Sequence, residues 1–157
     1  MITEIDRKHL RRAVDLAREA LEAGDSPFGS VLVSESGEVL FEDHNRTSSG
    51  DATRHPEFEI ARWAAANLAP EERKNAVVYT SGEHCAMCAA AHGMVGLGKI
   101  IYAASSRQLR EWIIEFGLTP GPVATIPIQD IVSGIEVVGP VPEFTAELKE
   151  MQRAYRV

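Results

Sequence analysis

Two short motifs constrain what this chain can be: His55-Pro56-Glu57 and, after 27 intervening residues, Cys85-Ala86-Met87-Cys88. Cysteines three residues apart on a helix share one face, so both sulfurs can reach a single ion. A histidine from elsewhere in the chain can supply a third ligand. Three nitrogen and sulfur ligands suit Zn²⁺, and three rather than four leave a coordination position open for water. The motifs therefore predict one zinc ion per chain, held by His55, Cys85 and Cys88.

Glu57 lies two residues beyond the predicted ligand His55. It is close enough to handle the protons of a water molecule on the metal. Zinc lowers the pKa of such a water toward about 7, so a neighbouring carboxylate can take its proton and deliver it to a substrate. We therefore expect Glu57 to be the catalytic acid and base.

A Cys-x-x-Cys pair also has two non-catalytic explanations. The first is a closed structural zinc site, which needs a fourth ligand. His84 is the only obvious nearby candidate, and its position before Cys85 points it away from the face that the two cysteines share. The second is a redox dithiol, which explains the cysteines but neither His55 nor Glu57. The two motifs together favour a catalytic site over both explanations.

Length and composition narrow the class of protein. A chain of 157 residues predicts one domain, residues 1–157. No apolar run approaches the roughly 18 residues that span a membrane, and the N-terminus is not typical of a secretory signal. These absences, with only two cysteines, predict a cytoplasmic protein without membrane contact. The formal net charge of −7 disfavours a nucleic-acid partner and favours a small-molecule substrate.

Hydrophobic periodicity predicts the order of the structural elements. Apolar spacings of three and four predict helices at 5–23, from Pro56 to about 68, from Cys85 to about Val95, at 107–116 and at 143–155. Apolar runs predict strands at 28–34, 38–42, 75–81, 99–105, within 121–131 and at 136–141. A strand, a helix and a strand in succession predict a parallel pair around the cysteines. The pattern indicates an α/β fold, a mixed sheet with helices on both faces.

Both motifs resemble those of the cytidine deaminase superfamily of zinc-dependent deaminases, in which His-x-Glu precedes Cys-x-x-Cys. Three further stretches look like their counterparts in bacterial guanine deaminases, fungal cytosine deaminases and tRNA adenosine deaminases. They are Ser26-Pro27-Phe28-Gly29, His44-Asn45-Arg46 and Tyr79-Thr80-Ser81. The resemblance covers roughly the whole chain, more weakly in the C-terminal third. It implies a three-layer α/β/α sandwich with a mixed five-stranded sheet, and a homodimer.

The resemblance also implies a reaction and a set of ring contacts. The reaction is hydrolytic deamination of a free nucleobase or nucleobase-like heterocycle of guanine, cytosine or amino-triazine type, with release of ammonia. In this family an asparagine at the place of Asn45 hydrogen-bonds the base, and an amide offers both a donor and an acceptor. Phe28, Pro56 and the backbone of Glu83 are expected to contact the ring. Trp112 and Glu115 are further candidates, with core packing and plain surface exposure as their respective alternatives.

The chain departs from the family pattern at two positions. His84 stands where proline usually precedes the first cysteine, and Pro56 stands where a small residue usually separates the histidine from the glutamate. In many relatives the backbone N–H at the second position contacts the base, and proline has none. These departures leave the identity of the substrate ring open.

Two alternative functions remain: deamination of adenosine to inosine in tRNA, and a non-catalytic binding module stabilised by zinc.

Overall fold

The computed structural model describes residues 1–157 and contains one sheet. Its strands are β1 (Gly29–Val33), β2 (Val39–His44), β3 (Val77–Gly82), β4 (Ile100–Ala104) and β5 (Val137–Val138). They lie in the order β2-β1-β3-β4-β5. Strand β1 is antiparallel to β2 and β3, whereas β3, β4 and β5 are parallel. The expected mixed five-stranded sheet is confirmed.

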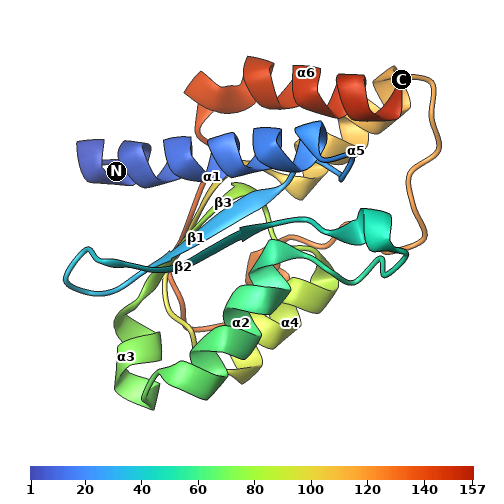
Figure 1. Ribbon diagram of the computed structural model, residues 1–157. Helices are drawn as coiled ribbons and strands as arrows, with labels where there is room; N and C mark the ends of the chain where they lie inside the picture. Colours follow the sequence, from blue (N-terminus) through green and yellow to red (C-terminus); the bar gives the residue numbers. More distant parts are fainter.

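Helices cover both faces of this sheet. They are α1 (Glu4–Glu22), α2 (Pro56–Asn67), α3 (Pro70–Asn75), α4 (Ala86–Met94), α5 (Ser106–Glu115) and α6 (Thr145–Arg156). Figure 1 shows α1, α5 and α6 above the sheet and α2 and α4 below it, so the α/β/α layering is also confirmed. None of these helices combines the length and the apolar character needed to cross a membrane.

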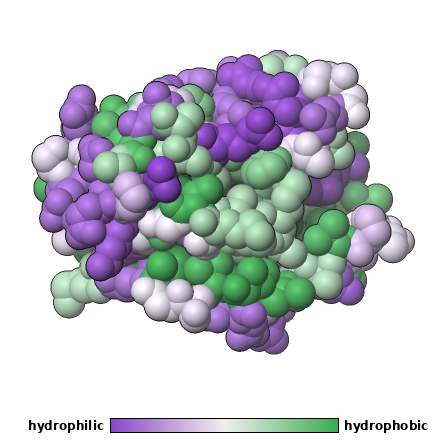
Figure 2. Space-filling view, turned by 90° about the horizontal axis from the view of Figure 1, so that it is seen from below, coloured by the Kyte–Doolittle hydropathy of each residue, from purple (hydrophilic) through white to green (hydrophobic).

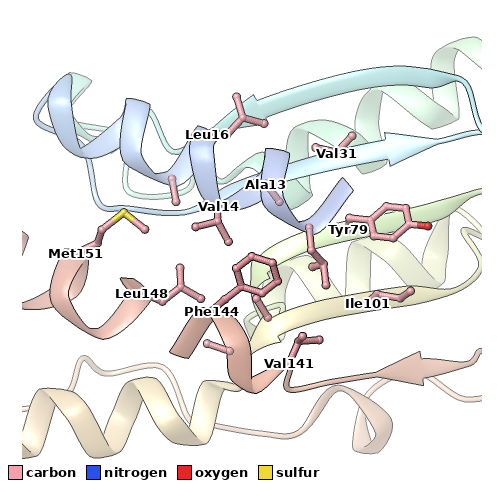
Figure 3. Packing of buried hydrophobic residues seen from close by; sticks show 14 of the residues in the cluster. Ala13, Val14, Leu16, Val31, Tyr79, Ile101, Val141, Phe144, Leu148 and Met151 are labelled. Atoms are coloured by element: carbon pink, nitrogen blue, oxygen red, sulfur yellow. The ribbon is translucent and has the colours of Figure 1, made fainter. Parts of the chain in front are cut away.

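Each face of the sheet has its own hydrophobic core, because successive strand residues point to opposite faces. In β1, Val31 and Val33 belong to the core beneath α1 and α6, whereas Leu32 belongs to the core shared with α2 and α4. Figure 3 shows the first of these cores, where Val14 of α1 lies close to Phe144. Burial on both faces explains why β1, β3 and β4 are largely apolar runs in the sequence.

The strand predicted within residues 121–131 is wrong. The chain there is irregular apart from a single 3-10 turn at Ile128–Asp130. Pro120, Pro122 and Pro127 explain the difference, because proline has no N–H to donate to a sheet ladder. The segment instead forms a loop that passes the edge of the sheet.

One edge of the sheet collects the segments that carry the predicted site. Parallel strands β3 and β4 both end there, β3 immediately before the cysteine motif. Strand β2 also ends there, because His44 pairs with Gly29 at the start of antiparallel β1. Asn45 therefore follows β2 at the same edge as Cys85. Ligand sites of α/β sheets lie outside the carboxyl ends of the parallel strands, which is where this edge lies.

Candidate active site

The three predicted metal ligands meet where two helices begin. His55 precedes the first residue of α2, Cys85 precedes that of α4, and Cys88 lies in the first turn of α4. Nδ1 of His55 lies 3.6 Å from each of the two sulfurs, and all three ligand atoms lie within 4.8 Å of one another. Zn–S and Zn–N bonds of about 2.3 and 2.0 Å at tetrahedral angles place sulfur and nitrogen about 3.5 Å apart. The three side chains therefore fit one zinc ion.

The electrostatics of this group favour a thiolate at Cys85. Hydrogen bonds from Cys88 and from His55 lower the pKa of Cys85 to about 4. The same contact with Cys85, together with burial, raises the pKa of Cys88. Both sulfurs lie at the N-terminal end of α4, where the helix dipole favours negative charge. A bound divalent cation is what allows both sulfurs to be thiolates at once.

His84 does not join the ligand group. Its side chain is buried, and its ring packs edge-on against His92 with the ring centroids 5.2 Å apart. Neither ring nitrogen of His84 has a hydrogen-bond partner, and burial holds the pKa of this histidine well below its ordinary value. The closed structural zinc site therefore lacks the fourth ligand that it requires, whereas three protein ligands are typical of catalytic zinc.

Glu57 is buried beside the ligands. The hydroxyls of Ser30 and Thr80 each lie 3.1 Å from its Oε1 atom, within hydrogen-bond distance. Burial raises the pKa of Glu57, and the positive charge of His55 and the two hydroxyl contacts oppose this shift. A carboxyl held in place with a raised pKa is suited to exchange protons near neutral pH.

Ser30 and Thr80 are absent from the residues that the sequence predicts for the site. Both are completely buried, one in β1 and one in β3. A signal for them does exist, because each is a polar residue within a mostly apolar strand, and a buried polar residue usually has a specific partner. Here that partner is the carboxylate of Glu57.

A cavity of about 550 Å³ opens onto this group. The predicted site residues in its lining are His55, Glu57, Cys85, Asn45, Phe28 and Glu83. Asn45 is only 4% exposed, and its Oδ1 atom has no hydrogen-bond partner in the protein. A buried acceptor without a partner is costly, so this position favours a ligand that donates a hydrogen bond.

Glu83 and Pro56 take different positions around the cavity. The carboxylate of Glu83 accepts hydrogen bonds from the backbone N–H groups of Ser106 and Ile128, at 3.0 and 2.8 Å. Its side chain therefore ties two loops together and leaves its backbone as the group for a ligand. Pro56 is buried in the first turn of α2 and is absent from the cavity lining.

The structure does not bring Trp112 or Glu115 to the cavity. Trp112 is 7% exposed and belongs to the core beneath α1 and α6, as the alternative of core packing expects. The carboxylate of Glu115 pairs with Nζ of Lys149 at 2.8 Å on the surface and is absent from the cavity lining. The side of α5 that reaches the cavity carries Leu109 and Ile113 instead. The lining of this cavity gives no support to the expected ring contacts through Trp112 and Glu115, which stay predictions.

Helix α6 adds two cavity residues that the sequence does not indicate for the site. Tyr155 and Arg156 lie in the lining although they follow the cysteine motif by about 70 residues. No local pattern marks them, because the return of α6 over the sheet edge is a property of the whole fold (Figure 1).

Comparison with known proteins now gives the family. Residues 3–104 match the family described as the cytidine and deoxycytidylate deaminase zinc-binding region. The chain belongs to this family. Its His55, Cys85 and Cys88 group is the zinc site typical of the family, and the protein is a deaminase, a hydrolase that requires zinc.

Relatives within the family differ in substrate. The chain is 33% identical over 146 residues to a probable cytosine deaminase of Schizosaccharomyces pombe, covering 88% of this chain and 86% of that protein. It is 35% identical over 103 residues to a guanine deaminase of Bacillus subtilis, covering 65% and 66%. A solved structure from studies of A-to-I editing by tRNA:A34 deaminases is 28% identical, with a TM-score of 0.65, and the match covers 90% of this chain and 99% of that one. Membership of this family therefore establishes that the reaction is a deamination, but it does not identify the substrate.

Proposed function

We propose that this deaminase acts on a small amino-substituted nucleobase or nucleobase-like heterocycle, of guanine, cytosine or amino-triazine type, and releases ammonia. The observation that carries this proposal is that one cavity is lined by the zinc ligands His55 and Cys85, by Glu57 and by Asn45, whose amide oxygen has no partner. Its volume of about 550 Å³ is typical of pockets that enclose small molecules. The net charge of −7 supports a small substrate over tRNA.

The residues of the site have separate roles in the proposed reaction. His55, Cys85 and Cys88 would hold the zinc ion, which would supply Lewis acidity and an activated water for a substrate whose ring carbon bears the amino group. Glu57, oriented by Ser30 and Thr80, takes one proton of the attacking water on its carboxylate and transfers it to a ring nitrogen. It then takes the remaining proton from the added hydroxyl and gives it to the leaving amine, which departs as ammonia. The Oδ1 atom of Asn45 accepts a hydrogen bond from the ring.

Ammonia release tests this function directly. The zinc-loaded protein is incubated with cytosine, guanine, an amino-triazine, the corresponding nucleosides and tRNA, and ammonia is measured against time. We expect turnover of at least one small heterocycle and none of tRNA. Exclusive turnover of tRNA would support adenosine deamination instead. No turnover at all, with about one zinc bound per chain, would support the non-catalytic binding module.

Replacing Asn45 should weaken substrate use without affecting the metal. We expect Asn45→Ala to lower kcat/KM about 10- to 100-fold, because a buried hydrogen bond to the ring is lost. The measurement is steady-state ammonia release on the best substrate of the panel. Asn67→Ala is the matched control, since Asn67 is an exposed amide on α2 that bonds only the carbonyl of Trp63. An Asn45→Ala enzyme within twofold of wild type would contradict this role.

We also propose that the protein is a homodimer and that the helices below the sheet form its interface. Helix α4 has no charged side chain, although Ala90 and Met94 are exposed on it. A helix that is apolar all round is normally buried, and Figure 2 shows apolar surface over this side of the molecule. We expect a dimer in sedimentation equilibrium and a monomer for Met94→Glu. The control is Ile114→Glu, an exposed position on α5, and a monomeric wild type would contradict the proposal.

We propose that residues 1–157 form one domain, because the two cores lie on opposite faces of one sheet. A single cooperative unfolding transition tests this.

We propose a cytoplasmic location, because metal-binding cysteines must stay reduced and neither cysteine is in a disulfide. Fractionation of the producing cells would contradict the location if the protein were found outside the cytoplasm.

A further inference from the structure

One arginine and no lysine lines the cavity, and this arginine has no acidic partner there. It is Arg156, near the end of α6. The only carboxylates in the lining are Glu57 and Glu83. Glu57 is held by two hydroxyls, and Glu83 is held by two backbone N–H groups. The positive charge of Arg156 is therefore not used by the acidic groups that share its cavity.

The guanidinium is fixed in place from one side. Its Nε atom donates to Oε1 of Gln152 at 3.0 Å, and this is the only hydrogen bond that Arg156 makes through its side chain. Gln152 is itself buried, and its Nε2 atom donates to the carbonyl of Pro27 at 3.4 Å. The two Nη atoms have no acceptor in the protein. A positioned guanidinium thus keeps its pair of terminal nitrogens for a ligand.

The unpaired state of Arg156 contrasts with its neighbours. Arg11 and Arg18 of α1 both pair with Glu147 of α6, and Arg153, one turn before Arg156, pairs with Glu150. Half-burial without a partner disfavours the charged form, and it lowers the pKa of Arg156. The chain has more acidic than basic residues, with a net charge of −7, and still places no carboxylate next to Arg156. A negative charge on a ligand in the cavity would offset this penalty.

The cavity also reaches from one layer of the fold to another. The zinc ligands lie at the N-terminal ends of α2 and α4, the helices below the sheet, whereas α6 lies above it (Figure 1). The volume of about 550 Å³ is in the range of pockets that hold drug-sized ligands, which are larger than a bare ring. The cavity that Glu57 and Arg156 share therefore has room for a substituent beyond the heterocycle.

We infer that the substrate is an amino-heterocycle with an anionic substituent, a carboxylate or a phosphate, which binds the guanidinium of Arg156 while the ring lies at Glu57. This inference rests on the proposed function and narrows its substrate class. The two Nη atoms offer parallel N–H donors that match the two oxygens of either anion. A tRNA phosphate has the same chemistry, but the acidic chain disfavours a long polyanion.

Matched substrates separate charge from size. The compounds are cytosine, cytosine-5-carboxylate, cytidine and cytidine 5′-monophosphate, with guanine, guanosine and guanosine 5′-monophosphate as a second series. We expect kcat/KM of the wild type to be about 10- to 100-fold higher for an anionic member than for its neutral counterpart. The carboxylate and the phosphate arms show which anion is used. Yeast tRNA is included as a polymer.

Variants of Arg156 test the residue itself. We expect Arg156→Gln to abolish the preference for the anion, because kcat/KM then falls about 10- to 100-fold more for the anionic members than for their neutral counterparts. Arg156→Lys should restore part of the preference, because it keeps the charge but not the paired donors. Arg153→Gln is the control, since Arg153 lies one turn away on α6 and outside the cavity lining.

Each outcome decides between the two proposals. Equal kcat/KM for charged and neutral members, or an unchanged preference in Arg156→Gln, overturns the anionic substrate and leaves the deaminase proposal standing. A preference for tRNA over the mononucleotides also overturns it. If no compound releases ammonia, the proposed function fails. The same compounds are then titrated by calorimetry, where loss of anion binding in Arg156→Gln supports the inference and equal binding refutes it.

Discussion

Glu57→Gln is expected to lower kcat roughly 100- to 10,000-fold, the range usual for a lost general acid or base. The amide has the same shape as the carboxyl, and it can still accept from the hydroxyls of Ser30 and Thr80, 3.1 Å away in the native protein. It cannot take up a proton and return it. The measurement is ammonia release under single-turnover conditions, together with the zinc content of the same preparation.

The matched control for this substitution is Glu59→Gln. Glu59 lies on the same helix, but its carboxylate pairs with Arg54 at 3.3 Å and is absent from the cavity lining. We expect Glu59→Gln to retain activity within about twofold, as is usual for a surface ion pair. A Glu57→Gln protein with normal zinc and an undiminished rate would show that another group moves the protons.

The metal ligands could be predicted from sequence because each motif is local. Three-residue spacing on a helix puts Cys85 and Cys88 on one face, and the parallel pair of strands brings that helix to the edge where α2 begins. Strands β1, β3 and β4 could be predicted for a related reason. They are buried on both faces and therefore read as continuous apolar runs.

The remaining parts of the site depend on contacts between distant segments. Helix α5 carries Leu109, Trp112 and Ile113 within two turns, and periodicity alone does not say which of them faces the core and which the cavity. The tertiary packing places Trp112 in the core and the other two at the cavity. Arg156 lies much farther along the chain, and only the return of α6 over the sheet brings it to the zinc ligands.

The proline-rich loop shows a different limit. Residues 121–131 contain enough apolar side chains to resemble a strand, and Ile128 is indeed completely buried. Burial of a side chain does not require a sheet, however, because a loop can anchor one apolar residue while its prolines prevent ladder formation. The backbone N–H of Ile128 bonds the carboxylate of Glu83 instead of a neighbouring strand. The same loop thereby helps to shape the cavity.

Loss of a single zinc ligand is expected to abolish both metal binding and activity. Changes to groups that merely orient metal ligands already weaken metal binding about 10- to 100-fold, so Cys88→Ser, which removes a ligand, should exceed this. Cys88 is completely buried, and its sulfur lies 3.6 Å from Nδ1 of His55, so no other side chain of the group can take its place. Metal analysis after dialysis and ammonia release measure the two effects.

Wild-type protein stripped with a chelator provides the comparison for this variant. Added zinc should restore the stripped wild type, because its three ligands remain. The same zinc should not restore Cys88→Ser at a concentration that saturates the wild type. Met87→Ser is the matched control, because Met87 lies between the two cysteines and is outside the ligand group. A Cys88→Ser protein that keeps stoichiometric zinc, or that deaminates at the wild-type rate, would require a different metal centre from the one formed by α2 and α4.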